Sequence, residues 1–256
     1  MINKAVDSLE QALAGLGDGS SIMVSGFGGS GVPVALIQAL EASGVGDLTL
    51  ILNTPRFLDG YAPKLFGEKR VRKLICSAAR GRGKSPSIFE QQWHAGELEV
   101  ELVPQGTFSE RVRAGGAGIP AFYTPTGFGT QIAEGGLPML HDAEGKVVKQ
   151  SEAKETRTFG EQEYVLEPAI TGDYALVKAW KADEAGNLVF RRTARNFNPM
   201  MATAGRITIA EVEEIVPAGA LDPDEIHTPG VFVQRLVRGE VYEKRIEQRT
   251  VRSREA

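Results

Sequence analysis

One glycine-rich stretch decides the fold: Asp18-Gly19-Ser20-Ser21-Ile22-Met23-Val24-Ser25-Gly26-Phe27-Gly28-Gly29-Ser30-Gly31-Val32-Pro33. An apolar run stops at the glycine-rich turn, and apolar residues at helical spacing follow directly. A strand, a tight turn and a helix in this order form a first βα unit. The N–H groups of such a turn suit an anionic group, often a phosphate. The spacing matches neither the dinucleotide fingerprint nor the P-loop, so a ligand loop and a turn needed only for packing both stay open.

Compact apolar segments alternate with helical patterns along the rest of the chain. Residues 48–52 and 71–76 read as buried strands, and 98–102 alternates apolar and acidic residues as a half-exposed strand does. Strands spaced by helices predict an α/β protein with an open, largely parallel sheet flanked by helices, in one domain over 1–256. Further sheet-like patterning is expected at 164–166, 174–179, 188–190 and 207–209.

Four segments carry further expectations about local structure. Leucines at helical spacing predict an amphipathic helix over 6–16. The glycine-rich stretch 106–136 is expected to be mostly irregular backbone, and the polar, turn-rich segment 136–155 to be a surface excursion. A short helix is expected at about 210–215.

Composition argues against several functional classes. The net charge of -4 gives no argument for binding nucleic acid or anionic membranes. We find neither a run of about 18 apolar residues nor a signal-peptide pattern, so a cytoplasmic protein is expected. The single cysteine, Cys76, cannot form an internal disulfide and reads as a buried small hydrophobe. His94, His141 and His227 share no metal-ligand spacing, so no metal site is expected.

Motifs in a fixed order along the chain carry a family resemblance. The opening stretch resembles the first signature of the family I coenzyme A-transferases, with Ser25 standing where that family usually has its first glycine. The chain looks like an A (alpha) subunit of the 3-oxoacid or 3-oxoadipate type, with the CoA-transferase / NagB-RpiA-like fold. The later blocks are Val103-Pro104-Gln105-Gly106-Thr107, Arg113-Ala114-Gly115-Gly116-Ala117-Gly118, Thr124-Pro125-Thr126-Gly127, Ala194-Arg195-Asn196-Phe197-Asn198-Pro199 and Glu225-Ile226-His227-Thr228-Pro229-Gly230.

The resemblance implies transfer of CoA from an acyl-CoA such as succinyl-CoA to a 3-oxo acid such as acetoacetate or 3-oxoadipate. A glutamate carboxylate attacks the thioester in a ping-pong reaction, so the thioester is a substrate and no cofactor is expected. The family's nucleophile motif, Ser-Glu-Asn-Gly, does not occur in this chain. The resemblance therefore implies a partner B (beta) subunit that supplies the glutamate, in a hetero-oligomer of α2β2 type. A CoA-ester hydrolase and a non-catalytic acyl-CoA or sugar-phosphate binding module are the alternatives.

The resemblance also indicates which residues of this chain contribute to the site. Gln105 is expected near the catalytic glutamate, where its amide can donate to a substrate oxygen. Asn53 follows the strand 48–52. A side-chain amide at the end of a strand can contact a ligand or form a turn, and both roles stay open. Residues 195–198 are expected in the scaffold or at an interface between subunits. The expected CoA and substrate contacts are Ser25, Gly26, Phe27, Gly28, Gly29, Ser30, Gly31, Asn53, Gln105, Gly115 and Gly116.

Two charged segments lie outside these motifs. The basic loop 80–84 is compatible with a ligand phosphate, an acidic partner or a plain solvated loop. The tail 240–256 mixes charges of both signs with apolar residues, which favours packing on a neighbouring chain over a nucleic-acid arm.

Overall fold

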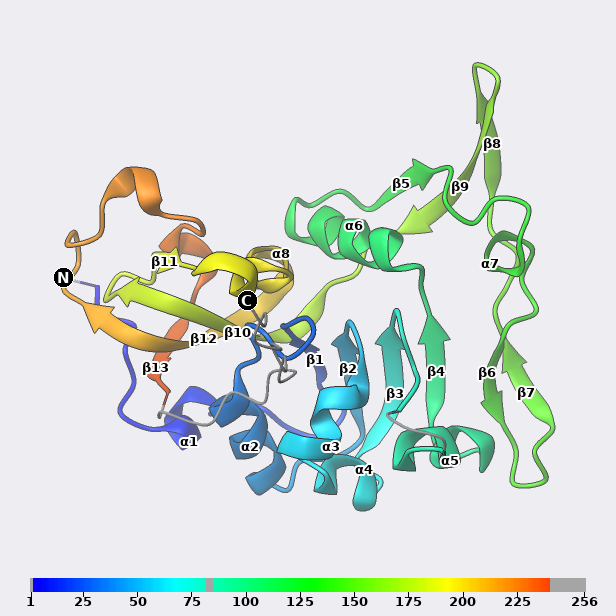
Figure 1. The fold of residues 1–256 in the computed structure, drawn as a ribbon, viewed down its shortest axis with the longest axis horizontal. Coiled ribbons are helices and arrows are strands. Elements are labelled where there is room, and N and C mark those ends of the chain that lie inside the picture. Colours follow the sequence, from blue (N-terminus) through cyan, green and yellow to red (C-terminus); the bar gives the residue numbers. More distant parts are fainter. Residues whose placement is uncertain (1, 82–84, 240–256) are drawn as a thin grey trace, which may run out of the picture.

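The computed structural model describes residues 2–81 and 85–239, so the predictions for 82–84 and for the tail 240–256 lie outside the described residues. An eight-stranded sheet forms the centre of the molecule (Figure 1). Its strand neighbours are parallel except β11 (Leu188–Val189), which runs antiparallel to β10. The predicted open, parallel sheet is confirmed. In spatial order the strands are β13 (Arg235–Arg238), β12 (Gly205–Val216), β10 (Gly172–Asp183), β1 (Ser21–Val24), β2 (Leu48–Leu52), β3 (Val71–Cys76) and β4 (Glu99–Leu102).

Helices cover both faces of this sheet, because successive side chains of a strand point to opposite sides. In β1, Ile22 and Val24 belong to one apolar cluster, whereas Met23 belongs to the other. The first cluster packs under α1 (Leu9–Ala12), α2 (Val34–Ala42), α3 (Leu58–Tyr61), α4 (Lys64–Gly67) and α5 (Ile88–His94). The second packs under α6 (Gln105–Gly116) and α8 (Asn198–Ala204). The result is a three-layer α/β/α arrangement.

Residues 121–168 form a projection that we call the arm (Figure 1). It contains a three-stranded antiparallel sheet of β5 (Ala121–Thr124), β9 (Gln162–Pro168) and β8 (Thr156–Phe159). It also contains α7 (Gln131–Glu134) and the hairpin of β6 (Pro138–His141) and β7 (Val147–Gln150), which lies beside β4. Strands β7 and β8 are exposed along their whole length. Trp93 of α5 donates from Nε1 to the carbonyl oxygen of Met139 at 3.2 Å, which ties the hairpin to the body.

Three expectations about local structure are wrong or only partly right. The stretch 106–136 is not mostly irregular, because α6 occupies its first part and buries Phe108 and Val112 against the sheet. Residues 210–215 are not a helix but belong to β12, whose register with β10 runs from Gly205 to Val216. Long parallel pairing overrides the short-range pattern there. The opening helix extends only over Leu9–Ala12.

Among residues 2–81 and 85–239 we find no helix long and apolar enough to cross a membrane. The same part of the chain holds no group of three or more potential metal-ligating side chains.

Candidate functional site

A tight loop follows β1 at the carboxyl end of the sheet, where ligands of open α/β folds gather. We call residues 25–31 the glycine loop. Phe27 and Ser30 exchange backbone hydrogen bonds of 3.0 and 2.9 Å, which close the loop on itself. Glycine is required at Gly31, which has φ +67°, because a Cβ there would lie 2.4 Å from the carbonyl oxygen of Ala194. The inner end of the loop is therefore packed against the protein.

The outer part of the glycine loop faces open space. A Cβ on Gly28 would meet nothing within 4 Å, although its φ of +58° still favours glycine. Phe27 is 47% exposed. Gly29 and Ser30 are half-buried, whereas Gly26 is buried and belongs to the packed side, because a Cβ there would lie 2.5 Å from Val32 Cγ2. The outer half of the loop has room for a ligand or a partner surface.

Asn198, at the start of α8, holds the glycine loop from below. Its Oδ1 accepts from Ser25 Oγ at 2.5 Å and from the backbone N–H of Lys178 at 2.7 Å. Its Nδ2 donates to the carbonyl oxygens of Gly31 at 3.0 Å and Ala194 at 2.8 Å. Both Ser25 and Asn198 are completely buried. Asn198 therefore has a scaffold role, one of the two roles expected for 195–198, and Ser25 is a loop anchor.

A buried ion pair lies beneath the N-terminus of α2. Glu211 of β12 accepts from Lys178 Nζ at 2.9 Å, and both side chains are buried. The second carboxylate oxygen accepts from the backbone N–H of Leu36 at 3.1 Å, in the first turn of α2. The protein thus supplies its own anion to this helix end.

Polar side chains from the ends of three neighbouring strands meet beside the glycine loop. Asn53 follows β2, Ser77 follows β3, and Gln105 begins α6 just after β4. Gln105 Nε2 donates to Asn53 Oδ1 at 2.9 Å, and Ser77 Oγ donates to the same oxygen at 2.7 Å. Asn53 is buried while Gln105 is exposed, so the cluster runs from the interior to the surface. The structure brings Asn53 and Gln105, both expected at the site, into direct contact.

Gly115 and Gly116 lie at the opposite end of α6 from Gln105, about 16 Å along the helix axis. A Cβ on Gly115 would lie 2.1 Å from the carbonyl oxygen of Ile170, and one on Gly116 would lie 2.0 Å from Thr203 Oγ1. These two glycines permit close packing of α6 against the chain before β10 and against α8. The structure does not bring them to the glycine loop.

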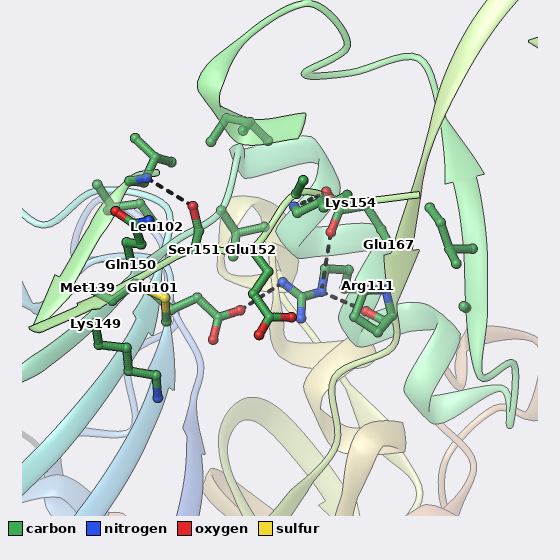
Figure 2. Close-up of a pocket in the computed structure, with 17 residues that line it drawn as sticks. Glu101, Leu102, Arg111, Met139, Lys149, Gln150, Ser151, Glu152, Lys154 and Glu167 are labelled. Carbon is green, nitrogen blue, oxygen red and sulfur yellow. Dashed lines mark hydrogen bonds and ion pairs between the residues drawn. The ribbon is translucent and has the colours of Figure 1, made fainter. Parts of the chain in front are cut away.

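A cavity of about 510 Å³ separates β4 and α6 from the arm. Figure 2 shows Arg111 of α6 between two carboxylates in this cavity. Its Nη1 donates to Glu101 at 3.1 Å and its Nε lies 3.9 Å from Glu167, which Lys154 also contacts at 2.5 Å. Burial acts to raise the pKa of Glu101, but Arg111 and Lys73 outweigh it, and the pKa is lowered. These charges pair with one another and link the arm to the body.

Burial shifts the pKa values of the cysteine and of one histidine. Cys76 is completely buried, and burial raises its pKa to about 12, so the thiol stays protonated at neutral pH. Burial is also the main cause of the lowered pKa of His227, whose Nδ1 accepts from the backbone N–H of Phe190 at 2.9 Å. The buried thiol of Cys76 is therefore not placed to act as a nucleophile.

Comparisons with known proteins place the chain among the coenzyme A transferases. The family model described as "Coenzyme A transferase" matches residues 6–239. The chain is 52% identical over 250 residues to the A subunit of the probable succinyl-CoA:3-ketoacid coenzyme A transferase of Bacillus subtilis (strain 168), covering 98% of this chain and 96% of that one. It is 51% identical over 252 residues to the A subunit of the succinyl-CoA:3-ketoacid coenzyme A transferase of Helicobacter pylori (strain J99 / ATCC 700824), covering 98% and 99%. Among solved structures, the acyl-CoA transferase YdiF of Escherichia coli O157:H7 matches with a TM-score of 0.73 at 23% identity, over 93% of this chain and 47% of its own, which supports the fold.

Proposed function

Because the chain belongs to the coenzyme A transferase family, we propose that it is the alpha subunit of an enzyme that moves CoA from succinyl-CoA to a 3-oxo acid. Acetoacetate and 3-oxoadipate are the acceptors that we propose. The relatives named as A subunits imply a partner B subunit, which we call the beta subunit, and we propose an α2β2 assembly with it. The observation that carries the proposal is the Asn53–Gln105 pair beside the open side of the glycine loop.

The chemistry needs a nucleophile. The family's nucleophile motif, Ser-Glu-Asn-Gly, does not occur in this chain. In the proposed reaction a glutamate of the beta subunit attacks the thioester carbonyl, and the CoA thiolate leaves to give a mixed anhydride. The thiolate then attacks the glutamyl carbonyl and releases succinate, which leaves a glutamyl-CoA thioester. The acceptor carboxylate reverses these two steps. No electron transfer occurs, so the proposed enzyme needs CoA esters as substrates and no further cofactor.

In this proposal the alpha subunit supplies hydrogen-bond donors to the oxygen of the thioester. A carboxylate is a weak nucleophile, so the negative charge that develops on that oxygen must be stabilised. Gln105 is exposed and can direct one amide N–H outward while the other remains on Asn53. The backbone N–H groups in the open part of the glycine loop are the second proposed source of donors.

The first experiment co-expresses the chain with its candidate beta subunit and measures loss of succinyl-CoA with and without a 3-oxo acid. We expect loss that depends on the acceptor, and each of the two chains should be inactive without the other. Borohydride added with acyl-CoA should inactivate the complex by reducing a glutamyl-CoA thioester, and the modified residue should lie on the beta subunit. Loss that ignores the acceptor would instead indicate a hydrolase, and binding without turnover would indicate a binding module.

We also propose that the protein is cytoplasmic. The single, buried cysteine is compatible with a reducing compartment. Fractionation of cells with an antibody against the chain tests this location directly.

A further inference from the structure

Ser77 belongs to none of the sequence motifs, yet it contacts the core of the candidate site. It follows β3 directly, between the ends of β2 and β4. Its backbone N–H donates to the carbonyl oxygen of Asn53 at 3.1 Å. Its Oγ lies 3.0 Å from the same carbonyl oxygen and donates to Asn53 Oδ1 at 2.7 Å. The hydroxyl therefore holds the side-chain amide of Asn53, while the backbone contact alone would align the two strand ends.

The hydroxyl also determines which end of the Asn53 amide faces Gln105. An amide oxygen has two lone pairs, and here Ser77 Oγ and Gln105 Nε2 occupy both of them. Within residues 2–81 and 85–239 no hydrogen bond uses Asn53 Nδ2. With its oxygen engaged on the protein side, Asn53 presents N–H groups, and Gln105 keeps one N–H in addition to the one that it donates.

We propose that Ser77 is a positioning residue, which acts through Asn53 to hold Gln105 with an N–H directed at a substrate oxygen. This inference rests on the proposed transferase function and adds the polarity of its oxygen site. The last torsion of an asparagine side chain has a broad profile with two opposite orientations. Without the Ser77 hydroxyl, the Asn53 amide can rotate and Gln105 loses its fixed partner. The oxygen site then loses an oriented donor.

The test uses the assembled complex with the beta subunit and a set of matched variants. Ser77→Ala should lower kcat about tenfold with little change in the KM for succinyl-CoA, because only the developing oxyanion gains from the oriented donor. Ser77→Thr keeps the hydroxyl and should recover most of the activity. Ser77→Ala combined with Gln105→Ala should be no slower than Gln105→Ala alone, because the group on which Ser77 acts is gone. Ser43→Ala is the matched control, since the Ser43 hydroxyl caps Leu40 at the far end of α2.

Several results would overturn the inference. These are unchanged kcat in Ser77→Ala, a Ser77→Thr variant as slow as Ser77→Ala, or effects of Ser77→Ala and Gln105→Ala that multiply as at independent sites. If Ser77 had only a structural role, Ser77→Ala would lower the Tm of the complex. It would leave kcat at low temperature unchanged, both alone and when combined with Gln105→Ala.

A second measurement separates this inference from the transferase proposal. If the wild-type complex transfers no CoA, the proposed function fails. A crystal structure of the Ser77→Ala complex would still show how the side chains of Asn53 and Gln105 are oriented. We expect the 2.9 Å contact between Asn53 and Gln105 to be lost or split in that structure and to be present in Ser77→Thr. An unchanged contact in Ser77→Ala would refute the positioning role whatever the activity.

Discussion

The anchoring of the glycine loop by Asn198 gives the sharpest prediction. Asn198→Ala removes four hydrogen bonds, to Ser25 Oγ, the carbonyl oxygens of Gly31 and Ala194, and the N–H of Lys178. A typical hydrogen bond contributes about 1 kcal/mol net, and groups left buried without a partner add to the loss, so the variant should be destabilised by about 4 kcal/mol. For a domain of this size that corresponds to a Tm lowered by roughly 8–16 °C.

Thermal unfolding of the purified complex measures this loss, and initial rates at low temperature measure its effect on the loop. We expect a raised KM for succinyl-CoA in Asn198→Ala, because the loop is no longer held in one conformation. Asn196→Ala is the matched control: its side chain donates to the carbonyl oxygens of Ser30 and Thr193 and accepts from the backbone N–H of Phe197, but it is only half-buried, so it should cost less, about 2 kcal/mol. An Asn198→Ala complex within about 1 kcal/mol of wild type, the size of a single hydrogen bond, would show that other contacts set the loop.

Four further predictions follow from single residues. Gln105→Ala should lower kcat by more than about tenfold without changing assembly, which steady-state rates and gel filtration check. Gly31→Ala should lower the Tm more than Gly28→Ala, because only the former drives a Cβ into backbone, and equal melting temperatures would contradict this. The lowered pKa of Glu101 means that its carboxylate stabilises the fold above the ordinary value of 4.5 and that this contribution is lost as the pH falls through the lower, folded-state pKa. Glu101→Gln should therefore weaken the pH dependence of the Tm on the acid side. Cys76 should react with a thiol reagent only on unfolding, since it is buried and its pKa is about 12, and fast labelling of the native chain would refute that placement.

The sequence predicts best what depends on local pattern. The strands at 48–52 and 71–76 agree with β2 and β3. β2 is buried along its whole length, as a nearly continuous apolar run predicts, whereas β3 is only partly buried because Arg72 and Lys73 interrupt its apolar residues. Asn53 could be placed at the carboxyl edge of the sheet because it follows the strand 48–52, whereas Gln105 was expected at the site only from the family resemblance. The prediction of irregular backbone over 106–136 was wrong because it took glycines as a sign of loops. Gly115 and Gly116 instead lie at the end of α6, where they permit close packing.

The contacts that organise the site could not be predicted, because they join distant parts of the chain. Ser25 and Asn198 are 173 positions apart, and Leu36 and Glu211 are 175 apart. Residues 210–215 were expected to form a helix, which hid the burial of Glu211 in a central strand. An asparagine or a glutamate carries no local sign of such a partner, so only the tertiary structure reveals it.

The buried Glu211 also bears on where a ligand can bind. The N-terminus of a helix attracts an anion because its first N–H groups have no partner within the helix. In α2 a carboxylate already accepts from the Leu36 N–H, and Lys178 neutralises that carboxylate from the other side. A phosphate placed there would lie close to an existing negative charge and gain little from the helix. The open part of the glycine loop and the N–H groups of Asn53 and Gln105 have no such competitor within the described residues. We therefore expect the reacting carbonyl of the acyl group, rather than a phosphate of CoA, to lie nearest to the carboxyl ends of β1 and β2.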